Sequence, residues 1–66
     1  MNRIKEVLKD KGIKQVWLAE KLGKSYNMVN GYVQNRRQPS LEDLYKIAEI
    51  LSIETKELLI DKNDIE

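Results

Sequence analysis

The side chains best suited to chemistry lie at the start of an expected helix that opens at Ser25. They carry hydroxyl, amide and ammonium groups, and they are Lys24, Ser25, Tyr26, Asn27 and Asn30. An amide can make two hydrogen bonds to the edge of an adenine, and a hydroxyl can bond to a base or a phosphate. This stretch therefore indicates recognition of duplex DNA by hydrogen bonding.

Catalysis and metal binding have little support in the composition. The chain contains no cysteine and no histidine. Disulfides, thiolate metal sites, zinc sites and His-based catalytic triads are therefore excluded. Its carboxylates lie on amphipathic helical patterns and are best interpreted as solvated faces, and a chain of 66 residues is too short for a deep pocket. We expect neither an enzyme nor a bound cofactor or metal.

The net charge of +1 conceals a marked asymmetry along the chain. Residues 1–37 hold nine Lys or Arg and three Asp or Glu, a net of +6, whereas residues 38–66 hold three Lys and eight Asp or Glu, a net of −5. A basic half beside an acidic half suggests one side that faces a polyanion and one that faces away from it. The longest apolar run is too short to span a bilayer and no signal peptide is evident, so a cytoplasmic protein is expected.

Five short helices should position the polar stretch, in one all-α domain over residues 1–66. Apolar residues recur at helical spacing over residues 2–11, 15–22, 25–35, 40–51 and 55–60. Asn2, Ser25 and Ser40 are expected N-caps, with Asp43 completing a capping box, while Gly12 and Asn35 should end helices in the left-handed region. Residues 15–34 then form two helices joined by a tight turn at Gly23, and residues 61–66 form an acidic tail.

Two residues in this region have open interpretations. Trp17 lies beside the apolar face of Leu18 and Leu22, where it could seal the edge of the core or shield the start of the next helix or the DNA backbone. Gly31 lies mid-helix at a cost of about 1 kcal/mol relative to Ala, which is either a tolerated defect or room for another surface.

The spacing of these residues resembles that of the lambda-repressor/Cro-type helix-turn-helix family, also called the XRE family. The first matching pattern is Gln15-x-x-Leu18-Ala19-x-x-Leu22-Gly23-x-Ser25, followed by Val29, Tyr32, Asn35, Arg36 and Arg37. The second is Pro39-Ser40-Leu41-x-x-Leu44-x-x-Ile47-Ala48-x-x-Leu51, ending in Ile53 and Leu58. The match covers nearly the whole chain.

The resemblance implies a compact five-helix DNA-binding domain, usually a homodimer on a near-palindromic operator. The implied function is a transcriptional regulator, most simply a repressor, with the helix that begins at Ser25 in the major groove. By position, the base contacts fall on Tyr26, Asn27 and Asn30. The phosphate backbone contacts fall on Gln15, Lys24, Ser25, Asn35, Arg36 and Arg37.

The chain departs from the family pattern in three respects. Lys14 precedes Gln15 where many members have a capping Ser or Thr. Gly31 stands where some members carry a base-reading side chain, which removes one possible contact. Leu8 and Val33 occupy positions where some members bury an Arg–Glu pair. Replacing a buried ion pair by two apolar residues can be neutral or stabilising, so we interpret the two differences as one coupled change. We therefore expect Leu8 and Val33 to be in contact.

The dimer surface and the biological role stay open at this level. Leu58, Leu59 and Ile60 are candidates for a dimer interface, although they could equally complete the monomer core. A phage repressor, an antitoxin, a restriction-modification controller and a housekeeping repressor all fit the sequence. The alternative function is a protein-interaction module or antitoxin-type partner that keeps the fold, with DNA binding secondary or lost.

Overall fold

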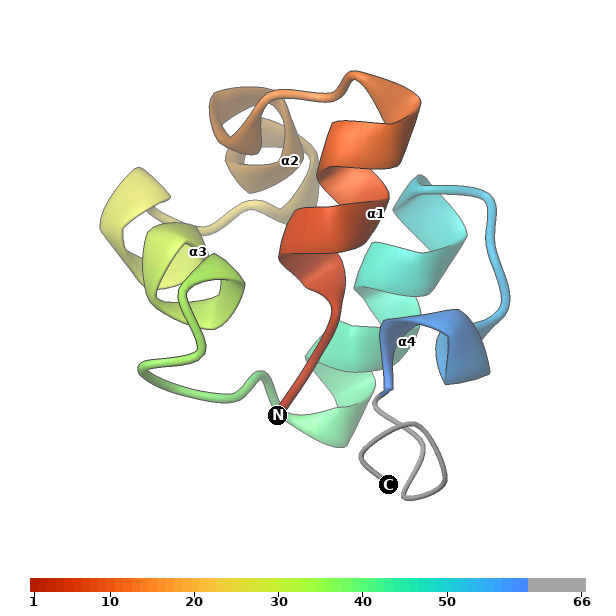
Figure 1. Ribbon diagram of the computed structural model, residues 1–66. Helices are drawn as coiled ribbons and strands as arrows, with labels where there is room; N and C mark the ends of the chain where they lie inside the picture. Colours follow the sequence, from red (N-terminus) through yellow and green to blue (C-terminus); the bar gives the residue numbers. More distant parts are fainter. Residues whose placement is uncertain (60–66) are drawn as a thin grey trace.

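The computed structural model describes residues 1–59 and contains four α-helices in this range (Figure 1). They are α1 (Ile4–Lys11), α2 (Gln15–Leu22), α3 (Tyr26–Val33) and α4 (Leu41–Ile50), followed by a 3-10 turn, η1 (Thr55–Leu58). The all-helical class is therefore confirmed, whereas the count of five helices is not. No helix within residues 1–59 has the length and hydropathy needed to cross a membrane.

One apolar core joins all five elements. Its members lie at helical spacing on the inner face of each helix, and they are Ile4, Leu8, Leu18, Ala19, Val29, Tyr32, Val33, Leu44, Ile47, Ala48, Leu51 and Leu58. α2 packs against α3 and α4, α1 against α3, and η1 against α4. Leu8 and Val33 both belong to this core, but their direct contact stays a prediction. Leu41 lies at the first residue of α4 and is 62% exposed, so it does not belong to this core.

The turn between α2 and α3 forms as the sequence predicts. Gly23 has φ 75° and its N–H donates to the carbonyl of Ala19 over 2.9 Å, while the N–H of Lys24 donates to the same carbonyl over 3.1 Å. Both bonds go to the carbonyl of Ala19, one of the last four of α2, and the left-handed geometry at Gly23 that allows them costs glycine no strain. Ser25 then caps α3, because its Oγ accepts from the N–H of Met28 over 3.1 Å. The helix that presents the polar stretch is thus fixed at its start by two local devices.

Asn2 links the N-terminal segment to the loop after α3. Arg3, and not Asn2 as expected, is the N-cap of α1, because the helix begins at Ile4. Asn2 Oδ1 still accepts from the N–H of Ile4 over 3.0 Å. Its Nδ2 donates to the carbonyl of Tyr32 over 3.0 Å and to Oε1 of Gln38 over 2.9 Å. The side chain is 3% exposed, so it is a fully bonded polar group inside the fold.

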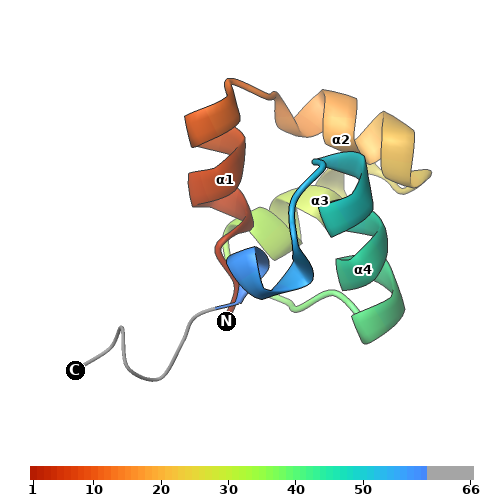
Figure 2. The ribbon, with the colours of Figure 1, turned by 90° about the vertical axis from the view of Figure 1, so that its right-hand side faces the viewer.

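The chain end at η1 differs from the helix expected over residues 55–60. Glu54 caps a single 3-10 turn, and Leu59 is extended and pairs with Asn2 in antiparallel fashion. The N–H of Arg3 donates to the carbonyl of Leu58 over 2.8 Å, so the N-terminal segment lies beside η1, as Figure 2 shows. A segment of four residues is too short to form a stable α-helix by itself and forms a 3-10 turn instead. The turn ends where Leu59 pairs with the N-terminal segment. Ile60 and the acidic tail over residues 61–66 lie outside the described residues.

Candidate nucleic-acid interface

The start of α3 presents two unshielded polar side chains. Tyr26 is 50% exposed and Asn27 is also exposed, while Val29 and Val33 on the inner side of the same helix are buried. The separation follows from the helical period, which directs residues three and four apart to one side. Tyr26 and Asn27 are therefore available to a partner along the outer side of α3.

Asn30 is held between two other expected contact residues. Its Nδ2 donates to Oε1 of Gln15, at the first residue of α2, over 2.9 Å. Its Oδ1 accepts from Nη2 of Arg36, in the loop after α3, over 2.6 Å. Gln15, Asn30 and Arg36, here called the polar bridge, thus connect three elements that the sequence separates by up to 21 positions.

The loop after α3 folds back onto Gly31. The carbonyl of Gly31 accepts from the N–H of Arg36 over 2.9 Å and from that of Arg37 over 3.3 Å. A Cβ on Gly31 would lie 3.1 Å from Cγ and 3.2 Å from Cδ of Arg37, so the glycine leaves room for the arginine stem. Both arginine side chains are exposed, and Nη1 of Arg37 also approaches Sδ of Met28 at 2.8 Å. The glycine thus brings two cationic groups close to α3.

Two of the expected phosphate contacts are engaged inside the molecule. Nζ of Lys24 lies 3.4 Å from Oδ2 of Asp43, so its charge is paired with α4. Asn35, which has φ 60° as expected, donates from Nδ2 to the carbonyl of Asn2 over 3.2 Å and accepts at Oδ1 from the N–H of Asn2 over 2.8 Å. Asn35 therefore holds the loop to the N-terminal segment, which sequence patterns did not reveal, because the bond spans 33 positions.

The start of α2 lacks a side-chain cap. Lys14 occupies the N-cap position in an extended conformation, and among the described residues no side chain accepts from the first amides of α2. The amides of a helix's first turn have no partner within the helix and carry its positive dipole end. The departure noted at Lys14 in the sequence therefore leaves these amides free to bond to an external acceptor.

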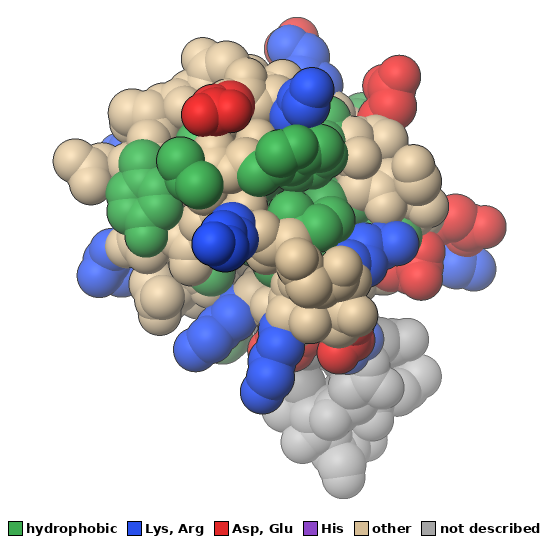
Figure 3. Space-filling view, turned by 90° about the horizontal axis from the view of Figure 1, so that it is seen from above, with side chains coloured by type: hydrophobic (Ala, Val, Ile, Leu, Met, Phe, Trp, Pro, Cys, Tyr) green, Lys and Arg blue, Asp and Glu red, His purple; other side chains and the backbone are tan. Residues whose placement is uncertain are grey.

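A separate apolar surface lies around the corner between α1 and α2. Trp17 is 40% exposed beside Val16, and Nζ of Lys21 lies 5.6 Å from the centre of the Trp17 ring. A shallow hollow there is lined by Gly12, Ile13, Lys14, Val16 and Trp17. Figure 3 shows this end of the molecule, where hydrophobic side chains reach the surface among Lys and Arg side chains. Trp17 thus covers the edge of the fold and stays partly open to solvent.

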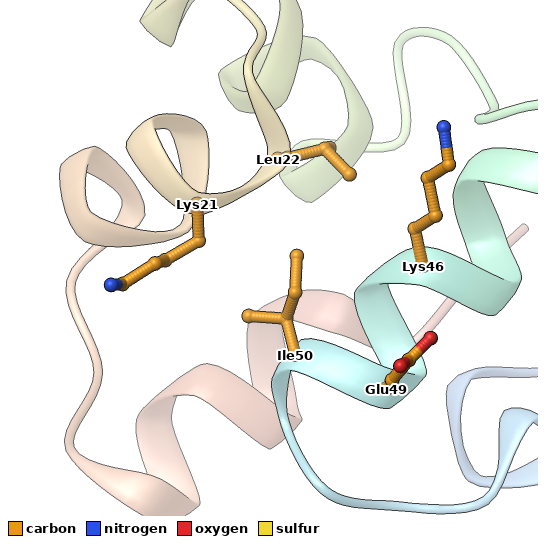
Figure 4. Close-up of a pocket in the computed structure, with 5 residues that line it drawn as sticks. All are labelled: Lys21, Leu22, Lys46, Glu49 and Ile50. Atoms are coloured by element: carbon orange, nitrogen blue, oxygen red, sulfur yellow. The ribbon is translucent and has the colours of Figure 1, made fainter.

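A second hollow lies between α2 and α4 (Figure 4). Leu22 and Ile50 form its apolar floor, while Lys46 and Glu49 lie on α4 at its rim and Lys21 points away from it. Within residues 1–59, no three His, Cys, Asp or Glu side chains come together in a way that could hold a metal ion. The hollow offers no group of side chains with an evident chemical role.

The residues expected at a dimer interface fall in different environments. Leu58 has no exposed surface and completes the monomer core, which contradicts its assignment to a contact with a second chain. Its burial follows from the packing of η1 against α4. Leu59 is 46% exposed and is available to a partner, and Ile60 lies outside the described residues.

Comparison with known proteins agrees with this geometry. A family model described as helix-turn-helix matches residues 4–58. The chain is similar to the crystal structure of a candidate DNA-binding protein from Bacteroides fragilis, with 45% identity, a TM-score of 0.86, and coverage of 88% of this chain and 94% of that chain. No curated protein matches the chain. The family match extends over most of the sequence and all four α-helices, and the protein belongs to the XRE-type helix-turn-helix family of DNA-binding proteins.

Proposed function

We propose that the protein is a sequence-specific regulator of transcription, acting as a repressor, that inserts α3 into the major groove of duplex DNA. The observation that carries the proposal is the exposure of Tyr26 and Asn27 at the start of α3, beside the exposed guanidinium groups of Arg36 and Arg37. Polar side chains at the start of a recognition helix reach base edges, while flanking cations bind phosphates. Membership of a DNA-binding family supports a non-catalytic role.

The phosphate contacts are assigned to groups that remain free to donate. Most of the phosphate contacts are assigned to Gln15, Arg36, Arg37 and the uncapped amides of α2. Ser25, the cap of α3, is assigned a further contact. Lys24 and Asn35 contribute less, because Asp43 and Asn2 already engage them. Cations that neutralise phosphates release counterions, so the affinity should fall as the salt concentration rises.

The proposal includes a homodimer on a near-palindromic operator. Leu59 supplies an exposed apolar side chain for this dimer, and Ile60, which is expected at the same interface, lies outside the described residues. A two-fold dimer would present its two α3 helices about 34 Å apart, one turn of DNA. The cytoplasmic location expected from the sequence stays a prediction.

An antitoxin-type partner or protein-interaction module is the second candidate function. The exposed pair Val16 and Trp17 favours it, because contiguous exposed apolar side chains commonly mark a surface that binds protein. Under this function, Trp17→Ala would abolish binding to the protein partner. If DNA binding has been lost, the unmodified protein and the variant Arg36→Glu with Arg37→Glu should both fail to bind duplex DNA.

Fluorescence anisotropy with mixed genomic duplex, at two salt concentrations, tests the first proposal. We expect binding that weakens at higher salt, and Arg36→Glu with Arg37→Glu should abolish it. Lys46→Glu with Lys56→Glu, two exposed lysines on α4 and η1, is the matched charge control and should change binding far less. Absent or salt-independent binding of the unmodified protein would refute the proposal. If the unmodified protein binds duplex DNA, selection from a random duplex pool would define the operator.

A further inference from the structure

We propose that Asn30 is a positioning residue rather than a base-reading one, and that it holds Gln15 and Arg36 in place to bind the DNA backbone. The inference rests on the proposed function and changes the role that the family resemblance implies for this residue. It is carried by the polar bridge, in which both ends of the Asn30 amide are engaged in the free protein.

The direction of every bond in the polar bridge is fixed by Arg36. A guanidinium has only donors, so the atom of Asn30 that meets Nη2 of Arg36 must be the carbonyl oxygen Oδ1. The Asn30 amide nitrogen then faces Gln15 and donates to its Oε1. This order leaves the Nε2 amide of Gln15 at one end of the bridge and the remaining guanidinium N–H groups of Arg36 at the other.

Both ends of the polar bridge therefore carry unused donors. Within residues 1–59, no hydrogen bond from Nε2 of Gln15 to the protein is found, and Arg36 is exposed. Phosphate oxygens accept hydrogen bonds and never donate them, so they complement both ends. Asn30 thus sets the orientation of a neutral donor on α2 and a charged donor on the loop after α3 at the same time.

The environment of Asn30 differs from that of its neighbour Asn27. Asn27 is exposed and makes no hydrogen bond through its side chain within the described residues, whereas Asn30 is half-buried. A bidentate contact to adenine needs both the oxygen and the nitrogen of the amide. Asn30 would have to leave two bonds to make it, one of them charge-assisted at 2.6 Å, while Asn27 would lose none.

Selection from a random duplex pool with matched variants tests the inference. Asn30→Ala should select the same sequence as the unmodified protein and bind it about tenfold more weakly, as expected for loss of a charge-assisted bond. Asn27→Ala, the control of the same residue type on the same helix, should alter the preferred base at one position. A changed preference in Asn30→Ala would overturn the inference.

The coupling of Asn30 to Arg36 gives a second readout. Arg36→Ala should lower the slope of log affinity against log salt by up to about 0.9, because one phosphate contact is lost. The double variant Asn30→Ala with Arg36→Ala should bind more tightly than the two single losses multiplied together predict, because both changes remove the Arg36 contact, while only Asn30→Ala also releases Gln15. Fully additive losses would contradict the positioning role. Asn30→Ser, which retains a polar group, serves as the second variant if Asn30→Ala unfolds.

Nuclear magnetic resonance of the free protein separates failure of this inference from failure of the proposed function. Arg36→Ala should shift the side-chain amide resonances of Asn30 and Gln15 and leave those of Asn27 in place. Unmodified protein that shows this coupling but binds no duplex would refute the proposed function, and with it the role of Asn30 toward DNA. Duplex binding without the coupling would refute the inference alone.

Discussion

At the scale of single residues, Asn2 links the start of α1 to the end of α3 and the loop that follows it. Its side chain satisfies the first amide of α1, the carbonyl of Tyr32 and the amide oxygen of Gln38. The sequence predicted only the first of these, because a capping residue is recognised from its neighbours whereas the other partners lie 30 and 36 positions away. Contacts of this range depend on how the helices pack.

Asn2→Ala should lower the free energy of unfolding by about 2–3 kcal/mol, because it leaves buried polar groups without partners. Urea denaturation would measure the change. Asn2→Asp is the matched variant, since it can still accept from the N–H of Ile4 but cannot donate to Tyr32 or Gln38. Equal stability of Asn2→Ala and the unmodified protein would show that solvent replaces these bonds at little cost.

Gly31 connects the stability of α3 to the placement of Arg37. Gly31→Ala should raise the free energy of unfolding by no more than about 1 kcal/mol, the gain in helix propensity, reduced by the shift forced on the Arg37 stem. The same shift should weaken DNA binding. In an Arg37→Ala background the stem is absent, so Gly31→Ala should gain more stability and no longer affect binding. Urea denaturation and anisotropy of all four proteins test this, and a lower free energy of unfolding in Gly31→Ala than in the unmodified protein would contradict it.

At the scale of elements, the sequence predicts most where local chemistry decides. The bounds of α2 and the turn at Gly23 were predicted to the residue, because glycine at φ 75° and the cap at Ser25 act within a few positions. The prediction of a fifth helix over residues 55–60 is wrong. The structure has a 3-10 turn that ends at Leu58, and Leu59 is extended and pairs with Asn2. The polar bridge also escaped prediction, since side-chain pairing across α2, α3 and the following loop has no periodic signature.

The two serine caps allow stability to be separated from binding. Ser25 Oγ accepts from the N–H of Met28 and Ser40 Oγ from that of Asp43, both over 3.1 Å. Ser25→Ala and Ser40→Ala should each lower the free energy of unfolding by about 1 kcal/mol, the usual cost of losing a cap. DNA affinity measured well below the melting temperature should fall only for Ser25→Ala, because α3 is the helix that we propose to enter the groove. A similar loss of affinity in Ser40→Ala would indicate that α4 also contributes to the DNA surface.

At the scale of the whole molecule, the N-terminal segment connects two regions that matter for function. It bonds to Leu58 and pairs with Leu59 on one side, and it bonds to Asn35 and Gln38 beside the arginine loop on the other (Figures 1 and 2). The same few residues therefore hold both the candidate dimer surface and the loop that is proposed to contact DNA. The basic first half of the sequence carries the groups that we propose to contact DNA, whereas Leu59 belongs to the acidic second half.

The neighbours Leu58 and Leu59 provide the test of the proposed dimer. Leu58→Ala should lower the free energy of unfolding by about 2–5 kcal/mol, because it leaves a cavity in the core. Leu59→Asp should keep the fold, since that side chain is 46% exposed, and should convert the dimer to monomer in sedimentation equilibrium. Leu41→Asp, which changes another exposed leucine outside the proposed surface, should leave the association unchanged. If Leu59→Asp associates as strongly as Leu41→Asp, the dimer does not use the surface around Leu59, and two copies must instead meet through another face or only on the operator.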